Sequence, residues 1–112
     1  MDFKESKPIY KQIADHMIHE ILHGTWSDND RIPSVREYAS NVEVNPNTVA
    51  RTYTLLSERG IIYTKRGVGY FLNDNATQAA RDYLKDQFEK EELPSLRSTI
   101  QLLGIKITDY FS

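Results

Sequence analysis

The sequence predicts a mainly α fold (α+β) with one small β-hairpin, and three observations support this prediction. Two short helical patterns follow one another across a brief turn between residues 34 and 59. The spacing of apolar residues then changes from helical to alternating over residues 61–72, which is typical of paired strands. Helical spacing returns after residue 75. We therefore predict an N-terminal domain over residues 1–73 and a helical tail over residues 74–112.

The first predicted helix runs from Pro8 to His23. Its apolar side chains recur every three or four residues and form one broad face, as in a helix packed against a core. These side chains are Tyr10, Ile13, Ala14, Met17, Ile18, Ile21 and Leu22. Gly24 follows at the position where glycine commonly ends a helix. The polar stretch from Thr25 to Arg31 then reads as a linker.

A capping signal opens the second helix. Ser34 is followed three residues later by Glu37, which is the spacing of a capping box. In this motif the serine hydroxyl and the glutamate carboxylate each bind a backbone N–H that the first turn leaves free. We predict a short helix that ends near Asn41.

A third helix is predicted over residues 45–59, after a turn at residues 42–44. Asn45 suits the N-cap, Pro46 suits the first helical position, and Gly60 provides the stop. Two short helices joined by a brief turn predict a helix-turn-helix.

A β-hairpin is predicted after Gly60. Residues 61–64 and 70–72 are β-branched or aromatic, and the glycine-bearing segment 65–69 separates them. Added to the two preceding helices, this hairpin predicts a winged helix-turn-helix. Asn73, Asp74 and Asn75 then break the pattern and are expected to cap a new helix.

The tail carries an apolar stripe that short isolated helices cannot bury by themselves. Pro94 interrupts it, and a second helical segment, with Pro94 near its first turn, ends at Gly104. A last fragment with Ile107 and Phe111 begins a further tail helix that the chain end at Ser112 cuts short. We interpret the stripe as a dimer interface, with packing on the first helix as the alternative. Its residues are Ala80, Tyr83, Leu84, Phe88, Leu96, Ile100, Leu103 and Ile107.

The formal net charge of −2 hides a basic central block. Residues 31–72 hold six basic and three acidic side chains, a net +3, and the segments before and after them are acidic. Because salt screens charges beyond about 8–10 Å, a local basic face matters more for phosphate contact than the total charge. The sequence has no cysteine and no apolar run near the about 18–20 residues that cross a bilayer, so we expect a cytoplasmic protein.

The entrance of the third helix is suited to a polyanion. Asn47, Thr48 and Arg51 share one polar face where free backbone N–H groups and the helix dipole favour phosphate. Asparagine pairs well with adenine and arginine with guanine, so Asn47 and Arg51 are candidates for contacts with base edges. Arg36, in the first turn of its own helix, is a candidate phosphate clamp. The plainer alternatives are a helix capped for stability alone and an Arg36 paired with Glu37 or Glu43.

The hairpin tip is also basic. Lys65 and Arg66, with Gly67 at the turn, are expected to reach the minor groove or the backbone, and a merely solvated tip is the alternative. Tyr70 is a candidate contact to sugar or phosphate, or else a half-buried strand aromatic.

Three histidines, His16, His19 and His23, lie on one stripe of the first helix. Imidazoles spaced in this way can bind zinc or nickel, but a polar helix face explains them without a ligand, and we predict neither a metal nor another cofactor. Nothing assembles a catalytic pair, so an enzyme is not expected.

These motifs together resemble the winged-helix domain of GntR-family bacterial transcriptional regulators over roughly residues 8–72. The resemblance rests on residues 32–37, 44–51, 58–62 and 66–71, and the short tail with Leu102-Leu103-Gly104-Ile105 resembles the YtrA subfamily. It implies a homodimeric repressor that binds a near-palindromic operator, often of its own transporter operon. The DNA-binding residues it implies, together with those argued above, are Ser34, Arg36, Asn45, Asn47, Thr48, Arg51, Lys65, Arg66, Gly67 and Tyr70.

One departure from the family pattern affects base reading. Many members carry arginines at the positions of Pro46 and Ala50, and Arg51 is expected to substitute from the next position. A winged helix used for protein contact and an effector-dependent activator are the alternative functions. The sequence identifies no effector, operator or regulated gene.

Overall fold

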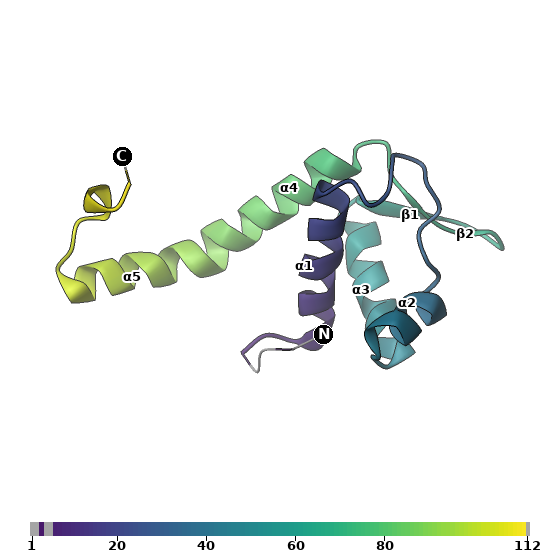
Figure 1. The fold of residues 1–112 in the computed structure, drawn as a ribbon, viewed down its shortest axis with the longest axis horizontal. Helices are drawn as coiled ribbons and strands as arrows, with labels where there is room; N and C mark the ends of the chain where they lie inside the picture. Colours follow the sequence, from purple (N-terminus) through teal and green to yellow (C-terminus); the bar gives the residue numbers. More distant parts are fainter. Residues whose placement is uncertain (1–2, 4–5, 112) are drawn as a thin grey trace. The chain divides into compact units, whose positions relative to one another are not determined.

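The computed structural model describes residue 3 and residues 6–111, and it confirms a mainly helical protein with one two-stranded antiparallel sheet (Figure 1). The chain divides into two compact units, Met1–Arg81 and Asp82–Ser112. The first unit contains the helix-turn-helix and the hairpin, and the second contains most of the tail. Each unit is described by itself.

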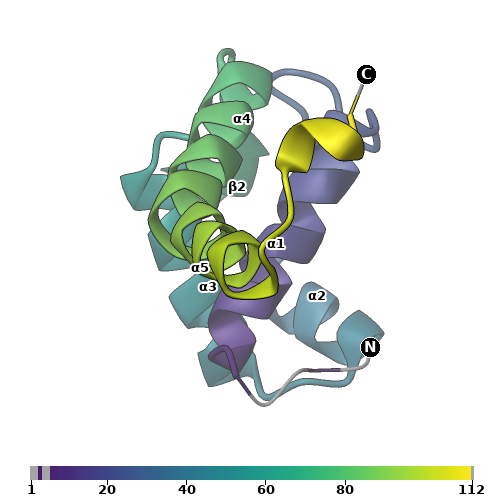
Figure 2. The same ribbon diagram turned by 90° about the vertical axis from the view of Figure 1, so that its left-hand side faces the viewer.

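Helix α1 (Ile9–Leu22) supplies one side of the core of the first unit. Ile13, Ala14, Met17 and Ile18 are fully buried, as the apolar spacing predicted. The helix ends at His23, and Gly24 follows with φ +82°. Figures 1 and 2 show α1 beside α3 (Pro46–Glu58), against which it packs.

Helices α2 (Val35–Val42) and α3 form the predicted helix-turn-helix. Both halves of the capping box are present: the Glu37 backbone N–H donates to the Ser34 hydroxyl at 3.1 Å, and the Ser34 N–H donates to the Glu37 carboxylate at 3.2 Å. Glu43, in the left-handed region with φ +57°, ends α2 and turns the chain toward α3.

Strands β1 (Ile62–Lys65) and β2 (Gly69–Leu72) form the predicted hairpin, in which Ile62 pairs with Leu72 and Lys65 pairs with Gly69. Arg31 bridges to Phe71, so the end of the linker runs beside β2. The buried side chains Ile61, Ile62 and Leu72 attach the hairpin to the core.

The tail differs from the prediction at two places. Helix α4 (Ala76–Gln87) passes into a π-helical turn at Phe88–Glu92 and then into α5 (Leu93–Leu103), so the chain stays helical through Pro94 (Figure 1). Proline has no N–H and its ring crowds the carbonyl four residues earlier. Pro94 lies in the first turn of α5, as predicted, where the missing donor costs little; the difference is the π-helical turn that joins α4 to α5.

The last fragment of the tail, expected to begin a helix, is a single 3₁₀ turn at Ile107–Asp109, separated from α5 by Gly104 with φ +66°. The prediction that the last residues start an α-helix was wrong, because three residues cannot complete an α-helical turn and its hydrogen bonds. Ser112 lies outside the described residues. Over residues 3 and 6–111, no helix has the length and apolarity needed to cross a membrane.

The capping box gives a first prediction. Ser34→Ala removes the acceptor for the Glu37 N–H and should lower the free energy of unfolding by about 1 kcal/mol in urea titrations followed by circular dichroism. Ser40→Ala, at an exposed position of the same helix, is the matched control and should change it by less than about 0.5 kcal/mol. An equal loss in both variants would show that the box does not stabilise α2.

Candidate nucleic-acid interface

The entrance of α3 is exposed and capped as predicted. The Asn45 Oδ1 accepts the Asn47 backbone N–H at 2.8 Å, and Pro46 occupies the first turn. Asn47 and Arg51 are exposed and Thr48 is half-buried. Since the cap uses the Asn45 oxygen, its side-chain amide N–H groups are what it can offer to a ligand.

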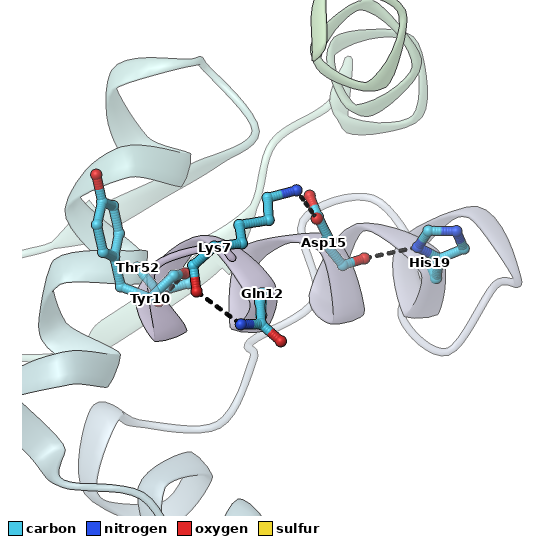
Figure 3. Close-up of polar contacts among 6 residues, drawn as sticks. All are labelled: Lys7, Tyr10, Gln12, Asp15, His19 and Thr52. Atoms are coloured by element: carbon cyan, nitrogen blue, oxygen red, sulfur yellow. Dashed lines mark hydrogen bonds and ion pairs between the residues drawn. The ribbon is translucent and has the colours of Figure 1, made fainter. Parts of the chain in front are cut away.

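The opposite face of α3 explains why these polar groups point outward. Val49, Thr52, Tyr53 and Leu56 are fully buried. The buried Thr52 hydroxyl donates to the backbone carbonyl of Tyr10 at 2.7 Å, which ties α3 to the first turn of α1 (Figure 3). The buried face of α3 thus holds the helix against the core, and the polar face at its N-terminal end stays at the surface.

Arg51 is held in place by an aromatic ring. Its guanidinium carbon lies 4.1 Å from the ring centroid of Tyr10, which is a cation–π contact. An open groove of about 370 Å³ surrounds this pair, lined by Pro8, Ile9, Tyr10, Asn47, Thr48 and Arg51. The three predicted polar residues of α3 therefore share one groove with the start of α1.

Arg36 extends from the first turn of α2 and is exposed. Among the described residues it forms no ion pair with Glu37 or Glu43, which was the plainer alternative. The hydrogen bonds from the backbone and side chain of Ser34 lower the pKa of Glu37, so this carboxylate is committed to the cap. The Arg36 guanidinium is therefore available to an anion.

The wing tip is exposed over Lys65, Arg66 and Gly67. The Val68 N–H donates to the Lys65 carbonyl at 2.9 Å and closes the turn, in which Gly67 has φ +76°. The Lys65 ammonium lies 4.7 Å from the Phe71 ring centroid. Lys65 is thus partly anchored on its own hairpin, and Arg66 stands at the tip.

Gly69 is where the wing meets the linker. Its φ is +145°, and a Cβ there would lie 3.0 Å from the Arg31 Nε. The glycine therefore allows the exposed Arg31 side chain to lie across the hairpin. Arg31 is a further basic group beside the wing that the sequence analysis counted in the basic block without assigning it to the interface.

Tyr70 is half-buried, and its ring packs edge-on against Tyr53 with centroids 4.9 Å apart. This matches the structural alternative given for it. A contact between Tyr70 and DNA stays a prediction.

Tyr10 is the residue whose position the sequence analysis did not foresee. Apolar spacing placed it with the core of α1, but its ring is half-buried and lies under Arg51. The two residues are 41 positions apart in the sequence, so no local pattern links them. The available signal was its position in the first turn of the helix, where a side chain on the core face can still reach the surface.

The histidine stripe forms no metal site within the described part of the chain. The Nδ1 atoms of His19 and His23 lie 2.7 and 2.6 Å from the carbonyl oxygens of Asp15 and His19, one turn back. His16 lies 3.3 Å from the Glu20 carboxylate. These contacts along one helix account for the stripe as a polar surface.

The predicted dimer residues do not share one environment. Ala80 and Tyr83 are buried within the single chain, and Leu84 and Ile100 are half-buried. The exposed members of the set are Phe88, Leu96, Leu103 and Ile107. Leu102, Tyr110 and Phe111 add further exposed apolar surface, with Leu102 86% exposed.

Together, the helix-turn-helix, the basic wing and the capped polar helix entrance define a winged helix-turn-helix protein, a class that reads DNA. The model of the family "bacterial regulatory proteins, gntR family" matches residues 9–72. The chain belongs to the GntR family. Membership identifies it as a DNA-binding transcriptional regulator.

Two relatives from Bacillus subtilis (strain 168) match nearly the whole chain. The uncharacterized HTH-type transcriptional regulator YhcF is 40% identical over 92% of this chain and 84% of its own length. The HTH-type transcriptional repressor YtrA is 36% identical over 96% of this chain and 82% of its own length, in agreement with the resemblance to the YtrA subfamily. The family and these relatives are regulators rather than enzymes.

Solved structures give the same result. A GntR-family regulator from Listeria monocytogenes is 37% identical, with a TM-score of 0.78 over 96% of this chain and 93% of its own. A putative GntR-family regulator from Bacteroides thetaiotaomicron is 43% identical, with a TM-score of 0.75 over 91% of this chain and 88% of its own.

Proposed function

We propose that this regulator is a homodimeric repressor that binds a near-palindromic operator, with its own transporter operon as the target. The observation that carries the proposal is the exposed, capped entrance of α3, where Asn47, Thr48 and Arg51 share one groove. The cap and the first turn use the backbone N–H groups of Asn47, Thr48 and Val49, so what this entrance presents to the major groove is side chains: an amide, a hydroxyl and a guanidinium. The relative YtrA, named a repressor, supports the sign of regulation.

Each part of the site has a proposed role. Asn47 and Arg51 read base edges, and Asn45 and Thr48 donate to nearby phosphates. Arg36 and the hydroxyl of Ser34, at the start of α2, fix the register on the backbone. In the wing, Lys65, Arg66 and Gly67 approach the minor groove, and Tyr70 in β2 supports the strand that follows this tip. We propose that the wing residues and the entrance of α3 contact the same DNA site.

The homodimer is proposed from the exposed apolar side chains of the tail, Phe88, Leu96, Leu103 and Ile107. A two-fold dimer places two recognition helices in successive major grooves about 34 Å apart, which a palindromic operator requires. Because its ligand is DNA, we place the protein in the cytoplasm, with no catalytic activity and no cofactor. An effector-dependent activator and a protein-contact module are the functions to be distinguished from this one.

The first experiment selects binding sites from a library of duplexes randomised over about 30 base pairs, using the full chain. We expect an enriched inverted repeat that binds two protomers and weakens steeply as salt rises. No enrichment over random DNA would contradict the function and favour the protein-contact module. Enrichment of one half-site bound by one protomer would contradict the dimer.

Arg51→Ala tests base reading at the entrance of α3. We expect it to weaken binding to the selected duplex by about 1–3 kcal/mol and to relax the preference at one base pair of each half-site. Competition against duplexes changed at each position measures this. Arg59→Ala, at the other end of α3, is the control. An equal loss on every sequence would place Arg51 on a phosphate instead.

The double substitution Lys65→Ala/Arg66→Ala tests the wing. It should weaken binding to all sequences and reduce the slope of log affinity against log salt by about 1–2, because two phosphate contacts are lost. Lys85→Ala/Lys106→Ala removes the same charge from the tail and serves as the control. A salt slope equal to that of the control would show that the wing does not contact the backbone.

A further inference from the structure

We propose that Tyr10 is a positioning residue for base recognition: the face of its ring orients the guanidinium of Arg51 toward the major groove. The inference rests on the proposed function and extends the DNA-reading surface from the helix-turn-helix to the first turn of α1. It assigns a role in specificity to an aromatic side chain outside both α2 and α3.

The backbone that carries the Tyr10 ring is held in place. The Tyr10 carbonyl accepts the buried Thr52 hydroxyl at 2.7 Å, so the backbone under the ring is tied to α3 one residue after Arg51 (Figure 3). The Gln12 side-chain amide donates to the Lys7 carbonyl at 2.7 Å, and the Lys7 ammonium pairs with the Asp15 carboxylate. These contacts hold the residues that lead into α1 and thereby the start of the helix.

The contact with the face of the Tyr10 ring leaves the N–H donors of Arg51 free of hydrogen bonds to the described residues. The guanidinium carbon of Arg51 lies 4.1 Å from the centroid of the Tyr10 ring, and this cation–π contact does not require any hydrogen bond from the guanidinium N–H groups. Bidentate pairing with the O6 and N7 atoms of guanine needs two of those donors in one plane. Helical side chains also lean toward the N-terminus, which carries Arg51 toward Asn47 and Thr48 in the same groove.

Ordering Arg51 before binding has an energetic consequence. A free arginine side chain loses rotamer entropy when DNA fixes it, and a side chain already held against an aromatic ring has less entropy to lose. Among the described residues that line this groove, Tyr10 is the only aromatic one. The Tyr10 ring should therefore contribute to affinity for the correct sequence more than to general attraction for DNA.

The test compares Tyr10→Leu, which removes the π face, with Tyr10→Phe, which keeps it. Both are measured on the duplex that the wild-type protein selects from the randomised library. We expect Tyr10→Leu to bind about fivefold more weakly and to relax preference at the same base pair as Arg51→Ala. Tyr10→Phe should stay within about twofold of wild type, and the salt slope of both variants should be unchanged.

A double-mutant cycle separates positioning from a general structural effect. In the Arg51→Ala background, Tyr10→Leu should cause no further loss, because the ring has no guanidinium to orient. Thermal unfolding of each variant checks the fold, and Tyr10→Met provides a second apolar replacement if the leucine variant is unstable.

Four results would overturn the inference. They are wild-type binding by Tyr10→Leu, tighter binding by Tyr10→Leu (the ring then holds Arg51 away from DNA), an equal loss in both backgrounds, and a Tyr10→Phe defect as large as that of Tyr10→Leu. The last would assign the effect to the hydroxyl. If the selection yields no motif, the proposed function itself fails, so the two failures are distinguishable.

Discussion

The arrangement of the interface depends on one buried side chain, Tyr53. Its hydroxyl donates to the Pro33 carbonyl at 2.6 Å, immediately before the cap of α2, and its ring packs edge-on against Tyr70 in the wing. Burial raises the pKa of Tyr53 above its ordinary value, so the hydroxyl stays protonated and remains a donor. One residue of α3 thus binds the chain just before α2 and packs against β2, so it connects the helix-turn-helix to the wing.

Helical periodicity lets α3 serve as core and interface at once. Val49, Thr52 and Tyr53 face inward, so Asn47, Thr48 and Arg51 are left at or near the surface. The basic block, residues 31–72, lies wholly within the first unit, the unit that contains the exposed polar face of α3. A net charge of −2 is therefore compatible with a DNA-binding face, because attraction to phosphate is a local property at physiological ionic strength.

Features that depend on neighbouring residues in the sequence were predicted correctly. The Ser34–Glu37 box, the Asn45 cap and the hairpin all follow from short spacings, and the structure confirms each. Two features that depend on distant residues were not predicted, the Tyr10–Arg51 cation–π contact and Arg31 across Gly69. The burial of Ala80 and Tyr83 within one chain had been given only as the alternative to a dimer interface. The π-turn before Pro94 was also missed, because proline signals an interruption without specifying its form.

The apolar stripe of the tail is partly buried within one chain, and this changes which of its side chains a dimer interface could use. With Ala80 and Tyr83 already buried, the apolar surface left for a second copy lies further along the chain, on Phe88, Leu96, Leu103 and Ile107. A single DNA-binding module of this kind buries roughly 600–1,000 Å² on DNA, which limits its discrimination between sites. Joining two modules through the tail doubles the contacts and makes half-site spacing part of the recognition. Specificity in the proposed dimer would then be shared between the side chains of α3, which read bases, and the tail, which sets the distance between them.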